Sequence, residues 1–140
     1  MLGNIEENTV LGIFGKLDMP YVNPLYPDGL PIAFQESVET GPATILSTLD
    51  GEGIQEYEVE IVQAARQMTP SQKSMVIRVT DQRLLGKTGG IVQGMSGSPI
   101  LQNGRIIGAV THVFVDDPTQ GYGLYIEWML SVSQAMDDAA

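Results

Sequence analysis

The feature that most constrains the fold is the pair Asn103-Gly104, which stands between two apolar runs. Asn-Gly is the strongest short signal for a β-hairpin, because both residues tolerate the positive φ angles of a type I′ turn. The flanking runs SPILQ and RIIGAVTHVFV therefore predict two antiparallel strands. A second hairpin is predicted at Asp50-Gly51-Glu52-Gly53, between ATILSTL and IQEYEVEIVQAA.

The rest of the sequence continues this pattern of short strands and turns. Further strands are predicted for TVLGIF (9–14) and MVIRVTD (75–81), with LLGKTGG (84–90) as a glycine-rich connector. Four prolines and a Pro-Asp-Gly turn make residues 18–31 an ordered loop. Asp116-Asp117-Pro118 predicts another turn, and IEWMLSVSQAM a short closing helix. A chain of 140 residues fits one domain, and this arrangement indicates an all-β barrel or sandwich.

Three glutamates alternate with apolar residues in the strand predicted after the hairpin at 50–53. Glu56, Glu58 and Glu60 fall between Tyr57, Val59 and Ile61. A period of two places the carboxylates on one face of the strand and the apolar side chains on the other. The pattern is consistent with a cation site, but it favours a solvated sheet face.

Charge excludes several classes of partner. Seventeen acidic and seven basic residues give a net charge of −10, which repels nucleic-acid backbones and anionic lipid surfaces. With no cysteine, the chain has neither a disulfide framework nor a thiolate metal site. The opening MLGNIEENTV lacks the cationic and apolar regions of a signal peptide, and no apolar run is long enough to span a bilayer. We expect no cofactor and no metal.

Two known motifs, the phosphate-binding P-loop and the nucleophile elbow of α/β-hydrolases, are matched only in part. Gly86-Lys87-Thr88 resembles the end of a phosphate-binding P-loop, but Asp81 occupies the position where that loop needs a glycine. The nucleophile elbow of α/β-hydrolases requires a glycine where this chain has Ser98, and a helix where it has a predicted hairpin.

The segment Gly94-Met95-Ser96-Gly97-Ser98-Pro99 fits a different chemistry. Glycines on both sides of Ser96 allow a tight turn that exposes its hydroxyl. The amides of Gly94 and Ser96 can then stabilise an oxyanion, a contribution of a few kcal/mol. The segment resembles the G-D-S-G-G-P turn of chymotrypsin-like serine peptidases. The local pattern alone leaves open a structural glycine-rich turn.

The wider sequence resembles the SpoIVB (stage IV sporulation protein B) serine peptidases of spore-forming bacteria. The resemblance rests on TGGIVQGMSGSPILQNGRIIGAVTHVFVDDPTQGYGLYIEWML, and extends back through MVIRVTD and GPATILSTLDGEGIQEYEVEIV to VLGIFGKL. It implies a trypsin-like antiparallel barrel and a Ser-His-Asp mechanism. It also implies export from the forespore into the intermembrane space. There the peptidase cleaves a regulatory partner of an intramembrane protease and activates late sporulation transcription.

Carried over by position, the resemblance makes Ser96 the nucleophile and Asp81 the triad acid. Asp81 also has a structural interpretation, as the cap of a turn after its strand. Met95 occupies the position where digestive enzymes carry an aspartate that pairs with a new N-terminus, so activation by that route is not available.

The general base is missing from its expected place. Chymotrypsin-like chains carry histidine before aspartate and serine, but the single histidine, His112, follows Ser96 by sixteen residues. We therefore expect residues 1–140 to be a fragment of the peptidase domain, with an incomplete first barrel, that is inactive alone. His112 is interpreted as structural, with contact to a substrate side chain as the alternative, and a Ser96–Lys87 dyad is a remote third possibility. Two functions remain open: a serine endopeptidase completed by upstream sequence, and a non-catalytic protein-interaction module.

Overall fold

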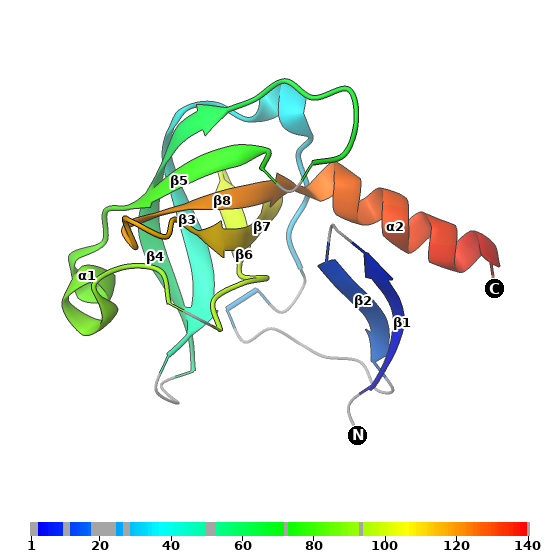
Figure 1. Cartoon of the computed structure of the whole chain (residues 1–140), viewed down its shortest axis with the longest axis horizontal. Helices are drawn as coiled ribbons and strands as arrows, with labels where there is room; N and C mark the ends of the chain where they lie inside the picture. The colour runs from blue at the N-terminus through cyan, green and yellow to red at the C-terminus, as the bar shows by residue number, and fades with distance from the viewer. Residues whose placement is uncertain are drawn as a thin grey trace.

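The computed structural model describes residues 3–9, 12–17, 25–26, 29–49, 53–71, 73–92 and 94–139. For 3–9, 12–17 and 133–139 only the backbone path is described. Its principal unit is a closed barrel of antiparallel strands in the order β3-β4-β5-β8-β7-β6 (Figure 1). The mainly β fold expected from the sequence is confirmed.

The barrel strands follow the predicted hairpins closely. Strands β3 (Gly41–Thr48) and β4 (Ile54–Ala64) pair on either side of the hairpin predicted at 50–53, of which residues 50–52 lie outside the described ranges. Strands β6 (Pro99–Gln102) and β7 (Arg105–Val113) flank Asn103-Gly104. Both turn residues have positive φ, +53° and +75°, as a type I′ turn requires. Strand β5 spans Met75–Val79.

Strand β8 (Gln120–Tyr125) closes the barrel between β5 and β7 and was not predicted. Its glycines weaken the strand signal, because glycine has a low intrinsic preference for strands. The packing explains one of them. A Cβ on Gly121 would lie 2.5 Å from the His112 carbonyl oxygen, so this close approach of β8 to β7 requires glycine.

The barrel interior is filled by alternate residues of the strands. In β4 the apolar members of the alternating pattern, Tyr57, Val59 and Ile61, are each at most 2% exposed, whereas Glu58 is exposed. The predicted two faces of this strand are therefore confirmed. The buried set includes Ala43, Ile45, Tyr57, Val59, Ile61, Met75, Ile77, Val79, Leu84, Ile91, Met95, Ile100, Ile107, Val110 and Tyr125.

Two helices lie at opposite ends of the barrel (Figure 1). Helix α2 (Ile126–Ala139) confirms the predicted closing helix. Helix α1 (Gln82–Thr88) lies where a glycine-rich connector was predicted, so that prediction is wrong. Asp81 caps its first turn and Gly89, in the left-handed conformation at φ +75°, ends it, and these two caps stabilise a helix of seven residues despite Gly86.

The described part of the segment before the barrel contains three elements. Strands β1 (Gly3–Thr9) and β2 (Gly12–Leu17) form a separate two-stranded antiparallel sheet, so the single strand predicted over 9–14 is wrong. Of the predicted loop 18–31, residues 18–24 and 27–28 lie outside the described ranges. A 3-10 turn, η1 (Gln35–Ser37), precedes β3. Ile32 forms an isolated bridge with Ile106, which places this segment against β7. No helix in the described ranges has the length and hydropathy to cross a membrane.

Candidate active site

Ser96 stands in a tight turn between α1 and β6. The flanking glycines, Gly94 and Gly97, adopt φ angles of +99° and +91°, which residues with side chains rarely take. The Met95 amide donates to the Val92 carbonyl at 3.1 Å, and the Ser98 amide donates to the Met95 carbonyl at 3.0 Å. The turn therefore closes on both sides of Ser96 and leaves this serine exposed to solvent.

The Ser96 hydroxyl has a main-chain partner. Its Oγ donates to the carbonyl oxygen of Thr111 on β7 at 3.0 Å. A carbonyl can accept this proton in a hydrogen bond but cannot remove it, so the serine is held in place without being activated. Within the described ranges, the amides of Gly94 and Ser96 donate no hydrogen bond. Both predicted oxyanion donors are thus available to a ligand.

Met95 attaches this turn to the core. Its side chain is 1% exposed, and its Sδ lies 3.5 Å from the Val92 amide as a weak acceptor. An aspartate here would place a charge among apolar side chains, at a cost of several kcal/mol unless it were paired. The turn is therefore anchored by apolar burial.

The loop between α1 and the turn is bonded to the connection between β7 and β8. The Ile91 amide donates to the Pro118 carbonyl at 2.7 Å. Gly90, at φ +144°, passes so close that a Cβ there would lie 2.2 Å from the same carbonyl oxygen. This contact fixes the backbone path that leads to Ser96.

Asp81 lies at the other end of this segment, where β5 gives way to α1. It is 5% exposed, and its carboxylate accepts four hydrogen bonds. Oδ1 accepts from the Arg83 amide at 2.9 Å and from Arg83 Nε at 3.1 Å. Oδ2 accepts from the Glu58 amide at 3.0 Å and from Arg83 Nη2 at 2.9 Å. A carboxylate offers about four lone-pair positions, so this one is saturated.

These bonds stabilise the charged form of Asp81. The Arg83 guanidinium holds the pKa of Asp81 well below its usual range, assisted by the Glu58 and Arg83 amides, while burial acts in the opposite direction. Arg83 also donates to the Glu56 carbonyl at 2.7 Å and lies over the Tyr57 ring at 5.2 Å from its centroid. Asp81 and Arg83 thereby join the start of α1 to β4.

The structure does not bring the predicted site residues into one hydrogen-bonded group. Asp81 bonds to Arg83 and Glu58, and Ser96 bonds to Thr111, so no hydrogen bond links the two. His112 is exposed on β7, where it pairs across the ladder with Tyr122. The Ser96 hydroxyl donates to the Thr111 main chain and not to the His112 ring. Lys87 lies in the last turn of α1.

Two residues of this region were not identified from the sequence. Arg83 binds Asp81, and the spacing Asp-x-Arg after a strand is a usable local signal for such a capped and paired aspartate. Thr111 supplies the acceptor for Ser96 from a strand fifteen residues later, and no local pattern marks that contact.

Comparisons with known proteins give a family and a fold for this chain. The family model described as SpoIVB peptidase S55 matches residues 1–130. No curated protein sequence matches the chain. Two crystal structures of one M. tuberculosis protein, Rv3671c, are similar in fold. The protease in its active form is 23% identical with a TM-score of 0.59, and 86% of this chain aligns with 52% of it. An inactive form, a serine-to-alanine mutant, is 19% identical with a TM-score of 0.65, and 95% of this chain aligns with 65% of it.

These structures confirm the predicted trypsin-like antiparallel barrel. At such identities the likeness establishes the fold alone. The chain spans between about half and two thirds of the length of the two structures.

Proposed function

Because the chain belongs to the SpoIVB peptidase S55 family, we propose that it carries the nucleophile of a serine endopeptidase. The observation that supports this most directly is the Ser96 turn. It exposes one hydroxyl between two glycines of positive φ, beside two backbone amides without acceptors in the described ranges. In this proposal Ser96 attacks the scissile carbonyl, and the Gly94 and Ser96 amides stabilise the oxyanion.

The strand beside Ser96 offers a place for an extended substrate. Strand β7 pairs with β6 only as far as Ala109 in the ladder, and beyond it the Val110 carbonyl accepts from the Gly97 amide. The Phe114 amide donates to Gln120 on β8. Neighbouring residues of a strand direct their backbone N–H and C=O groups to opposite sides. The N–H and C=O of Val113 therefore point to the edge of β7 that faces away from β8. A peptide that adds to this edge would pass Thr111 and therefore Ser96.

Asp81 remains the proposed triad acid by family comparison, with one structural requirement. Its carboxylate already accepts four hydrogen bonds, so an imidazole N–H can bind only if one of them is released. The candidate for release is an Arg83 side-chain bond, since the Arg83 side chain is 59% exposed and can be rehydrated. The base in this proposal is a histidine outside residues 1–140.

We also propose the biological role that the family implies: cleavage of a regulatory partner of an intramembrane protease in sporulation signalling, after export from the forespore. A second candidate is a non-catalytic protein-interaction module. The observation that favours it is that the Ser96 hydroxyl is bonded to a main-chain carbonyl and, in the part of the chain that the structure describes, to no base.

A fluorophosphonate probe separates the two candidates, because it reacts only with an activated serine. We expect the longer natural protein to be labelled at Ser96, with the adduct located by peptide mass spectrometry. We expect the 140-residue chain to remain unlabelled, both as wild type and as the His112→Ala variant. Absence of labelling in the longer protein would favour the interaction module. Labelling of the short chain that is lost in His112→Ala would show that His112 is the base.

A further inference from the structure

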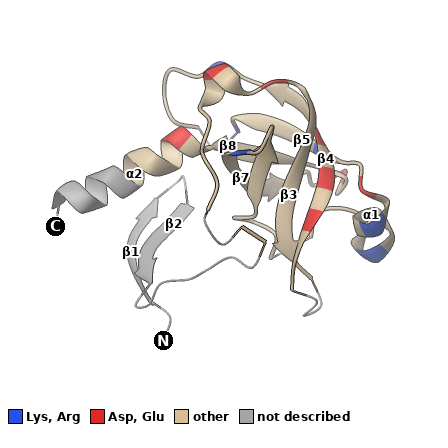
Figure 2. Cartoon of the chain, turned by 180° about the vertical axis from the view of Figure 1, so that it is seen from behind, with Lys and Arg blue, Asp and Glu red and all other residues tan. Residues whose placement is uncertain are grey.

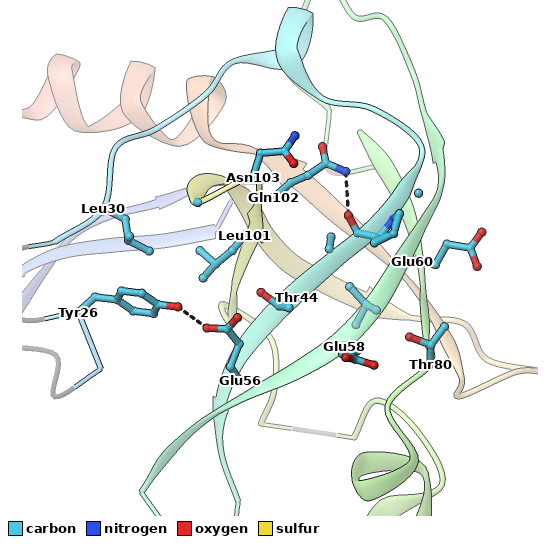
Figure 3. A pocket seen from close by; sticks show the side chains of 15 residues that line it. Tyr26, Leu30, Thr44, Glu56, Glu58, Glu60, Thr80, Leu101, Gln102 and Asn103 are labelled. Carbon is cyan, nitrogen blue, oxygen red and sulfur yellow. Dashed lines mark hydrogen bonds between the residues drawn. The ribbon is translucent and has the colours of Figure 1, made fainter.

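A groove on the outer face of the barrel, apart from the Ser96 turn, has the shape and charge of a peptide-binding surface. Its volume is about 740 Å³. It lies over β3 and β4, between the end of β6 and the segment that carries Tyr26 and Leu30 (Figure 3). We call it the β4 groove. Its lining includes Tyr26, Leu30, Pro42, Thr44, Glu56, Glu58, Glu60, Leu101 and Gln102.

The two sides of the β4 groove differ in chemistry. Leu30, Leu101 and the ring of Tyr26 lie on one side, and Glu56, Glu58 and Glu60 follow one another along β4 on the other (Figure 3). Figure 2 shows acidic residues along β4 and basic residues on α1. None of the described residues that line the groove is a lysine or an arginine. Its charge therefore favours a cationic ligand with apolar surface.

The spacing of the carboxylates favours a linear ligand over a single ion. Residues two apart on a strand are separated by about 6.8 Å along the strand, whereas ligands of Ca²⁺ or Mg²⁺ converge to within roughly 2.0–2.6 Å of the metal. No group of three or more His, Asp or Glu side chains in the described part of the chain is arranged to hold a metal ion. An extended peptide has the same repeat as β4, so basic residues at alternate positions match the three glutamates.

The outer carboxylates have partners that a ligand can replace. Glu60 forms an ion pair with Arg78 of β5, in which the two side chains are 39% and 48% exposed. Glu56 accepts from the Tyr26 hydroxyl. An exposed ion pair such as Glu60–Arg78 contributes little to stability, so exchanging Arg78 for a ligand cation costs little. The Tyr26–Glu56 hydrogen bond is partly buried. Glu58, between them, is exposed and its carboxylate has no hydrogen bond or ion pair within the described ranges.

We propose that the β4 groove binds an extended segment of a protein partner in which lysine or arginine occupies alternate positions. The ligand's basic side chains pair with Glu56, Glu58 and Glu60, while its backbone and intervening apolar side chains pack against Leu30 and Leu101. Binding uses none of the groups assigned to peptide cleavage, so this surface acts in either candidate function.

The test is fluorescence anisotropy with a labelled, end-blocked Lys-Ala-Lys-Ala-Lys peptide and the purified 140-residue chain. We expect Glu58→Gln to weaken binding by roughly twofold to fivefold, the range of an exposed ion pair. The matched control is Glu36→Gln, which makes the same change in net charge at an exposed site outside the groove. It should leave affinity within experimental error at physiological ionic strength. Equal losses of affinity in the two variants would mean that the net charge of the protein attracts the peptide without a specific site, and would overturn the proposal.

A change in the opposite direction provides an independent test. Arg78→Gln removes the competitor for Glu60, so affinity should rise by about twofold or more, whereas Arg66→Gln makes the same charge change outside the groove and should have a smaller effect. A peptide of equal composition with its lysines consecutive should bind more weakly than the alternating one. Equal affinity for the two peptides would overturn the inferred register. Each result is a binding constant and is independent of whether Ser96 is catalytic.

Discussion

Asp81 and Ser96 lie at the two ends of one segment, but they differ in burial and in hydrogen bonding. Asp81 is buried, with every lone-pair position of its carboxylate bonded to Arg83 or Glu58. Ser96 is exposed; among the described residues its hydroxyl has a single hydrogen bond, to a main-chain carbonyl, and the Gly94 and Ser96 amides donate none. The first environment contributes to folding stability, and the second leaves polar groups free for a ligand. A mutation of Ser96 should therefore change activity with little effect on stability, whereas a mutation of Asp81 should change stability directly.

The largest expected effect is on activity at the exposed end. Ser96→Ala in the longer natural protein should lower kcat by about 10⁶-fold, the loss found when the serine of a comparable triad is removed. The free energy of unfolding should change by no more than about 1 kcal/mol, since the variant loses one exposed hydroxyl and its hydrogen bond to the Thr111 carbonyl. Peptide hydrolysis and urea denaturation measure the two quantities. Wild-type turnover by the variant would remove Ser96 from the mechanism.

At the buried end, Asp81→Ala should lower the free energy of unfolding by about 2–4 kcal/mol. The change removes the cap of α1, worth about 1 kcal/mol, and leaves the Glu58 amide without its acceptor, at about 1–3 kcal/mol. Urea denaturation of the 140-residue chain, with Ser96→Ala as the matched control, tests this. Equal stability of the two variants would contradict the structural role of Asp81.

Lowering the pH should remove the stability that the ionised Asp81 carboxylate contributes. Because the folded-state pKa of Asp81 lies below its unfolded value, its charged form contributes stability that is complete above about pH 4, the unfolded value, and is lost as pH falls toward the folded one. Wild type should therefore lose more stability than Asp81→Asn between neutral pH and about pH 2. The test is to measure the denaturation midpoints of wild type and Asp81→Asn across this pH range. Midpoints that fall in parallel for the two proteins would contradict the prediction.

The smallest effect is expected at Arg83, the exposed partner of the same pair. Arg83→Gln should lower the free energy of unfolding by less than Asp81→Ala does, because the Arg83 side chain is 59% exposed and its ion pair is screened by solvent. It should also raise the pKa of Asp81, since the Arg83 side chain is the main cause of the lowering. Denaturation at neutral and acidic pH measures both effects. If Asp81 is the triad acid, this variant should retain fluorophosphonate labelling in the longer protein, because it frees carboxylate lone pairs.

Local sequence determined most of the barrel and the shape of the Ser96 turn. Asn103-Gly104 specifies its hairpin because those residues accept positive φ whatever surrounds them. The alternation of Glu56 to Ile61 likewise specifies which face of β4 enters the core. The glycines at 94 and 97 predict an exposed serine for the same local reason.

Tertiary structure alone decided which partners the functional groups meet. LLGKTGG has glycines that disfavour a helix, yet α1 forms because Asp81 caps it and is itself held by Glu58, twenty-three residues earlier. The Ser96 hydroxyl meets Thr111 only because β7 returns beside the turn. A backbone preference depends on a residue and its neighbours and can be read along the chain. A hydrogen-bond partner depends on which distant segments the closed barrel brings together, which no local pattern records.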